Sequence, residues 1–163
     1  EIAVRAAITG HLVLSTLHTN DSPSTIARLV DMGIEPYLVS SAVVGIVSQR
    51  LVKVLCPKCK ASYVASYSDK KLLGINENEN ITLHKAVGCN SCNQGYLGRA
   101  AVHELMPINE GIRRLIDTGA NTDKIRERAL KDGMTTLFQS AVALALKGQT
   151  TLEEVLRVGF TLG

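Results

Sequence analysis

The chain has 163 residues, of which 45% are hydrophobic and 20% are charged, so it is long enough to bury the core of one domain. Its 18 basic and 15 acidic residues leave a net charge of +3, which is too small to indicate a nucleic-acid or membrane-surface protein. The uncharged stretch 36–49 falls short of the roughly 20 apolar residues that a membrane-spanning helix needs. The composition therefore excludes a disordered chain, and we expect no direct insertion into a membrane.

The first third of the chain predicts an α/β arrangement. Apolar periodicity, turn residues and caps first predict a helix that ends at Gly10 and a strand over 11–17. Two helices follow, one that begins near Asp21 and one that runs from Pro36 to Val47. A second strand is predicted over 51–55. A continuous apolar run such as 11–17 is typical of a strand that is covered on both faces. The opening residues 1–7 resemble the middle of a helix, so we expect the chain to be part of a longer protein.

The last third predicts one strand followed by helices. The strand spans 99–106, and the helices span 110–117, 123–131, 137–147 and 152–158. Glycines at 119, 133 and 148 follow the first three helices at the positions where a left-handed residue commonly ends a helix.

All four cysteines lie between these parts, in two CxxC pairs: Cys56 with Cys59, and Cys89 with Cys92. Two residues between cysteines let both thiolates of one turn reach the same ion, and two such turns complete a tetrahedral site. The spacing favours structural Zn²⁺ over disulfide bonds or a redox-active thiol pair. Because the stretch 56–92 carries few large apolar residues, we expect the metal to replace a missing core.

Polar side chains gather at the carboxyl end of the predicted strand 11–17, where ligands bind in open α/β sheets. Thr16 and His18 face the same way along such a strand, and His11 points the opposite way. From the pattern alone, His18 is either a functional residue or an ordinary histidine at a strand end. For His11 we favour a structural role. The sequence has no GxSxG or HExxH motif, which argues against a serine hydrolase and a zinc protease.

Four segments of the chain resemble the secretion ATPase superfamily. They read TGHLVLSTLHTN (9–20), RLVDMG (28–33), SQRLVKVLCPKCK (48–60) and GCNSCNQGYLGRAAVHELMPI (88–108). The chain is most similar to the assembly-type hexameric motors of type II secretion and type IV pilus systems. Retraction-type relatives lack the four-cysteine insertion, so the resemblance indicates assembly or secretion rather than retraction.

The resemblance implies a partial RecA-like ATPase core over 1–55, a tetracysteine zinc subdomain over 56–106 and an α-helical carboxyl-terminal subdomain over 107–163. It implies that His18, with Thr16 beside it, contacts the terminal phosphate of ATP near the hydrolytic water, where positioning supplies most of the rate. Arg50 either supports the nucleotide site or a subunit contact, or forms a structural salt bridge.

A family P-loop, GxxxxGK followed by Ser or Thr, is absent from this sequence, as is the acidic strand that holds Mg²⁺. We therefore expect ATP and Mg²⁺ to bind only in the longer protein, and this chain alone to be inactive. The resemblance implies a cytoplasmic homo-hexamer that reaches the membrane through an inner-membrane platform protein.

An alternative interpretation of the sequence is a zinc-ribbon module that binds nucleic acid or acts as an adaptor. Such a module needs a strongly basic face with aromatic stacking groups, whereas aromatic residues make up 4% of this chain. We therefore expect no nucleic-acid partner.

Overall fold

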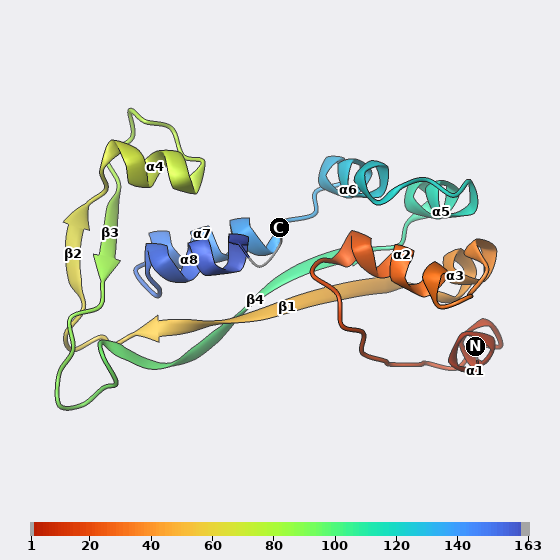
Figure 1. Cartoon of the computed structure of the whole chain (residues 1–163), viewed down its shortest axis with the longest axis horizontal. Helices are drawn as coiled ribbons and strands as arrows, with labels where there is room; N and C mark the ends of the chain where they lie inside the picture. Colours follow the sequence, from red (N-terminus) through yellow and green to blue (C-terminus); the bar gives the residue numbers. More distant parts are fainter. Residues whose placement is uncertain (1, 161–163) are drawn as a thin grey trace. The chain divides into compact units, whose positions relative to one another are not determined.

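The computed structural model describes residues 2–160, which form a mixed α/β structure, as expected (Figure 1). The chain divides into two compact units, each assembled from two segments. Unit 1 consists of Glu1–Ser48 and Glu104–Thr135, and unit 2 of Gln49–His103 and Thr136–Gly163. None of the helices within residues 2–160 combines the length and apolar character that a membrane span requires.

Strands far apart in sequence pair with one another. Strand β1 (Gly45–Leu55) pairs with β4 (Tyr96–Pro107), and β2 (Ala61–Val64) pairs with β3 (Thr82–Lys85). The second pair is antiparallel, with Ala61 opposite Lys85 and Val64 opposite Thr82. Because β2 follows β1 and β3 precedes β4, the second pair is an excursion of the chain between the two long strands.

Unit 1 is built mainly from helices around an apolar core. Its helices are α1 (Ile2–Ile8), α2 (Ser22–Asp31), α3 (Pro36–Ala42), α5 (Glu110–Asp117) and α6 (Thr122–Lys131). Isoleucines and methionines of α2, α5, α6 and β4 form the core, among them Ile26, Met106 and Ile112, each at most 3% exposed. Helices and one end of β4 are therefore held together by apolar contacts in this unit.

Asp21 anchors the start of α2 in two ways. Its carboxylate accepts a hydrogen bond from the N–H of Ser24 at 2.8 Å, as a helix N-cap does, and it pairs with the Arg126 guanidinium at 2.5 Å. Burial acts to raise the pKa of Asp21, but the bonds from Ser24 and the charge of Arg126 outweigh it and lower the pKa. The carboxylate thus fastens α2 to α6 within unit 1.

The predicted strand over 11–17 is wrong. This segment has no regular secondary structure, and Leu12 and Leu14 are 85% and 88% exposed. A strand needs a neighbour to satisfy its N–H and C=O groups, and no strand pairs with this segment within residues 2–160.

The predicted helix from Pro36 to Val47 is also too long. Helix α3 ends at Ala42, and β1 begins at Gly45. The cause is local, because Val43, Val44, Ile46 and Val47 are β-branched and favour a strand over a helix. The helices predicted in the last third are confirmed within about two residues of their ends.

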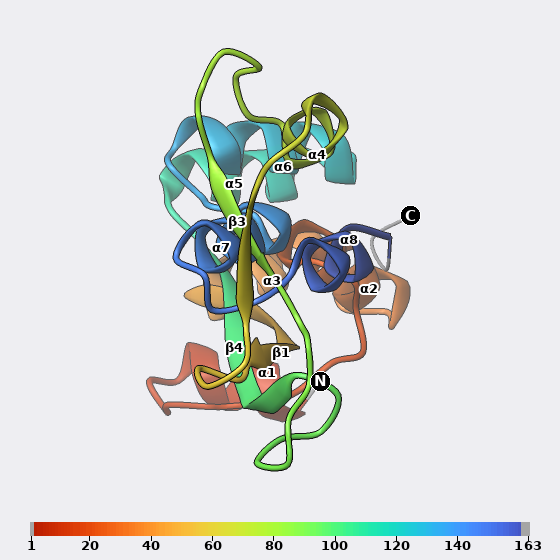
Figure 2. The ribbon, with the colours of Figure 1, turned by 90° about the vertical axis from the view of Figure 1, so that its left-hand side faces the viewer.

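Unit 2 contains an apolar core that the sequence did not lead us to expect. Helix α4 (Tyr67–Leu73) and the β2–β3 pair lie beside α7 (Leu137–Leu146) and α8 (Leu152–Phe160) (Figure 2). Leu73 and Leu83 are 4% and 1% exposed and belong to the same buried cluster as Leu137 and Val155. The expectation that a metal replaces a missing core is therefore wrong, because α7 and α8 supply the apolar partners.

We expect Leu83→Ala to lower the free energy of unfolding of unit 2 by about 2–5 kcal/mol, because the truncation leaves a cavity in a closed core. Leu72→Ala on the exposed side of α4, where the side chain is 45% exposed, is the matched control and should cost about 0.5 kcal/mol. Urea denaturation followed by circular dichroism measures both. Equal losses for the two variants would contradict the packing of β3 against α7 and α8.

Candidate functional site

The four cysteines lie at the point where the β2–β3 excursion leaves and rejoins the long strands. Cys56 follows the last residue of β1, and Cys59 lies two residues before β2. Cys89 and Cys92 lie between β3 and β4. The N–H of Cys56 donates to the Gly95 carbonyl at 2.8 Å, so the backbone already holds the two CxxC turns together.

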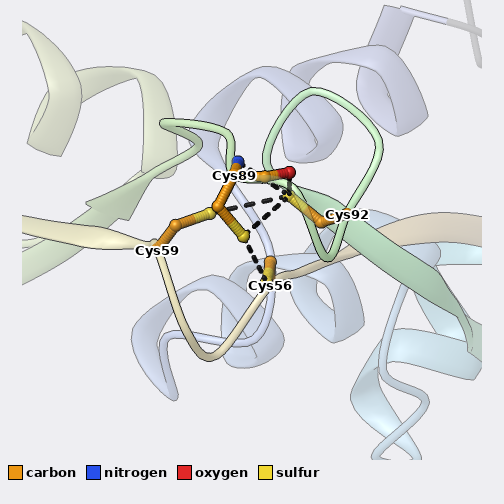
Figure 3. A group of neighbouring side chains, drawn as sticks. All are labelled: Cys56, Cys59, Cys89 and Cys92. Carbon is orange, nitrogen blue, oxygen red and sulfur yellow. Dashed lines mark hydrogen bonds between the residues drawn. The ribbon is translucent and has the colours of Figure 1, made fainter.

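The sulfurs face one another across a small space (Figure 3). The Sγ atoms of Cys56 and Cys89 are 4.0 Å apart, those of Cys59 and Cys92 are 3.7 Å apart, and those of Cys89 and Cys92 are 3.6 Å apart. All four sulfurs lie within 4.8 Å of one another. Four sulfurs placed tetrahedrally about 2.3 Å from an ion are about 3.8 Å apart, so this arrangement fits a four-coordinate metal site.

Desolvation and the close approach of the sulfurs shift the pKa values of two thiols in opposite directions. Desolvation raises the pKa of Cys59 to about 12, and contacts with the other three thiols add to the shift. Desolvation acts to raise the pKa of Cys92 as well, but hydrogen bonds from Cys89 and the Gly95 N–H outweigh it and lower the pKa to about 7. Four sulfurs this close cannot all ionise unless a cation compensates their charge.

Glycine at position 95 is required by both conformation and space. Its φ is +89°, and a Cβ there would lie 2.6 Å from the Cβ of Ala86. Gly88, before the second CxxC pair, has a φ of +108°. Glycine at both positions therefore permits the tight backbone path around the cysteines.

Lysine side chains add contacts around the cluster. Lys58 Nζ donates to Ser91 Oγ at 3.3 Å and so connects the two CxxC turns. Lys60 Nζ donates to the carbonyl of Gly148 after α7 at 2.7 Å. These two cations lie beside the cysteines in sequence and attach the first CxxC turn to its surroundings.

Thr16 and His18 lie together in the exposed segment of unit 1 that precedes α2. Within residues 2–160 neither side chain has a hydrogen-bond partner, whereas His11 Nδ1 lies 3.2 Å from Thr9 Oγ1. Arg50 is half-buried on β1 in unit 2. The roles predicted for Thr16, His18 and Arg50 therefore stay predictions, and the four cysteines are the predicted site residues that the structure gathers into one cluster.

A buried polar cluster next to this segment was missed by the sequence analysis. The N–H of Ser22 donates to Glu104 Oε1 at 2.7 Å, and Ser22 Oγ donates to Ser48 Oγ at 3.1 Å. Glu104 is 1% exposed. A carboxylate inside the apolar strand 100–106 was the available signal, since such a group is buried only when it is hydrogen-bonded.

Comparison with known proteins identifies the class. Residues 1–157 match the family described as Type II/IV secretion system protein, and the chain belongs to that family. It is 47% identical over 159 residues to the Type II secretion system protein E of Pseudomonas aeruginosa, and 45% identical over 161 residues to the Type IV pilus assembly ATPase PilB of Myxococcus xanthus. These matches cover 97% and 95% of this chain but only 32% and 28% of the two relatives.

A solved structure supports the same class. The crystal structure of the pilus retraction motor PilT with bound ADP matches with a TM-score of 0.62 and 27% sequence identity. The match covers 96% of this chain and 35% of that one. The chain thus spans about a third of the length of the relatives it resembles.

We expect about one metal ion per chain, most favourably zinc, because four thiolates at this spacing suit a tetrahedral ion. Cys59→Ser and Cys92→Ser should abolish stoichiometric binding, and Asn90→Ala, at an exposed position of the same turn, is the matched control. Elemental analysis measures the metal content.

Removal of the metal with a chelator should abolish amide-exchange protection around 56–60 and 88–95, while Leu83 stays protected by its apolar core. Unchanged protection at the cysteine turns would contradict a metal site.

Proposed function

We propose that this chain is the carboxyl-terminal part of a hexameric cytoplasmic ATPase that powers type IV pilus assembly or type II protein secretion. The supporting observation is the similarity, over at least 95% of the chain, to both a secretion protein and a pilus assembly ATPase. In the longer protein, ATP and Mg²⁺ would be held mainly by residues outside this chain, since this sequence has no P-loop motif.

In this proposal the cysteine cluster is a structural Zn²⁺ site. A bound zinc ion supplies the positive charge that keeps the four thiolates deprotonated and joined. Four protein ligands leave no open coordination position, so the site has no role in hydrolysis. The chain's own contribution is to bring Cys56 and Cys59 against Cys89 and Cys92 at the base of the β2–β3 excursion.

We assign His18 to the ATPase reaction, with Thr16 beside it. The His18 imidazole is exposed and makes no hydrogen bond within the described residues, so both ring nitrogens are available to a ligand. A neutral imidazole can donate to a phosphoryl oxygen or orient the attacking water. Arg50 carries a positive charge that would support the nucleotide site or a subunit contact.

The assembled motor would act at the cytoplasmic face of the inner membrane, through a platform protein of the pilus or secretion machine. The pilus and secretion branches share every motif present in this chain. We therefore propose the motor activity for both branches, and hybrids with a relative from each branch test which one this chain serves.

We expect His18→Ala to lower kcat for ATP hydrolysis by about 100-fold, because a group positioned on the transferred phosphate acts mainly in the transition state. The measurement uses a hybrid in which this chain replaces the matching part of the Myxococcus xanthus pilus assembly ATPase PilB, to which it is 45% identical. A parallel hybrid with the Pseudomonas aeruginosa secretion protein E tests the other branch.

His11→Ala is the matched control from the same segment and should change kcat by about threefold or less, because the His11 ring contacts Thr9. Equal activity of the His18→Ala and unsubstituted hybrids would contradict the assigned role. Hydrolysis of ATP by the chain alone would contradict the proposal that its phosphate-binding residues lie elsewhere.

A further inference from the structure

Unit 1 has a surface groove between α5 and α6, with a volume of about 790 Å³. Ile112 and Ile116 of α5 and Ile125 and Ala129 of α6 are buried in the core of the unit. The groove is formed by other faces of the same helices, so the core packing of unit 1 does not account for it. None of the residues that line it belongs to the cysteine cluster or to the segment around His18.

Helix α6 presents one continuous stripe to the groove. Lys124, Glu127, Arg128 and Lys131 line it, at positions i, i+3, i+4 and i+7, which share one face of a helix. All four are exposed. Three cations and a single carboxylate thus share this face, which leaves the stripe with a net positive charge.

Helix α5 supplies an apolar floor and a further cation. Leu115 lines the groove and also packs against the core, and Arg114 lies beside it. Gly111 lets the Arg128 guanidinium lie directly against α5, since a Cβ at this position would come within 2.3 Å of that group. The groove therefore offers an apolar strip bordered by positive charge.

Internal ion pairs satisfy only part of this charge. Arg114 pairs with Glu110, and Arg128 pairs with Asp132 at 2.8 Å. Lys124 and Lys131 form no ion pair within residues 2–160. These two lysines are seven positions apart in the helix, which corresponds to about 10.5 Å along the helix axis.

We propose that the α5–α6 groove binds an acidic amphipathic helix of a partner protein. Carboxylates at positions i and i+7 of that helix have the same spacing of about 10.5 Å and would pair with Lys124 and Lys131. Apolar side chains between them would cover Leu115 and the aliphatic stems of the groove's long side chains. The carboxylates of Glu110 and Glu127 would repel a continuous phosphate backbone, so a peptide fits the charges better than a nucleic acid.

The test uses the full metal-loaded chain and a synthetic helical peptide of about 15 residues, with glutamates at i and i+7 and leucines between them. Fluorescence anisotropy gives the Kd, and amide chemical shifts locate the contact. We expect saturable binding with shifts confined to α5 and α6. Lys124→Gln combined with Lys131→Gln should weaken binding by about tenfold. This is the loss expected when two exposed ion pairs are removed, each with a free energy near the upper end of the usual range.

Lys71→Gln combined with Lys85→Gln is the matched control, because these lysines are also exposed but lie outside the groove, in unit 2. This control should leave the Kd within about twofold. Equal weakening by both pairs, shifts outside α5 and α6, or equal binding of a scrambled peptide of the same composition would overturn the proposal. Self-association of the chain that depends on Lys124 and Lys131 would also overturn it, since the occupant would then be a second copy. The readout is peptide binding, so its failure is distinct from a failure of the proposed ATPase function.

Discussion

The two ends of the β2–β3 excursion depend on the convergence of four sulfurs at one point. Cys56 and Cys59 follow one long strand and Cys89 and Cys92 precede the other, so the cluster closes the base of the β2–β3 excursion. Pairs of these sulfurs lie 3.6–4.0 Å apart, so four thiolates would repel one another. A cation between them attracts each thiolate and offsets that repulsion. The cluster thereby fixes where the excursion starts and where it returns.

The cysteine cluster does not act alone. Leu73 and Leu83 bury their side chains in the same apolar cluster as residues of α7 and α8. The tip of the excursion is thus held by hydrophobic contacts, and its base by the sulfurs and by the Cys56–Gly95 backbone bond. Two kinds of interaction at opposite ends explain how a polar insertion keeps one conformation.

The sequence was sufficient to predict features that depend on neighbouring residues. CxxC spacing indicated the cysteine cluster, and periodicity with glycine stops located α5 to α8. It failed where distant contacts decide the structure. The run 11–17 has strand composition but no partner strand in the described structure, and the burial of Leu83 depends on helices more than 50 residues further along the chain. The bond between Ser22 and Glu104 joins residues 82 positions apart, a separation that no local pattern can predict.

X-ray absorption at the metal edge of the isolated chain tests the four-sulfur site most directly. We expect four sulfur neighbours at about 2.3 Å and no light-atom ligand in the inner sphere, because the four cysteines complete a tetrahedron. A mixture of sulfur with nitrogen or oxygen ligands, or fewer than four sulfurs per metal, would contradict the account.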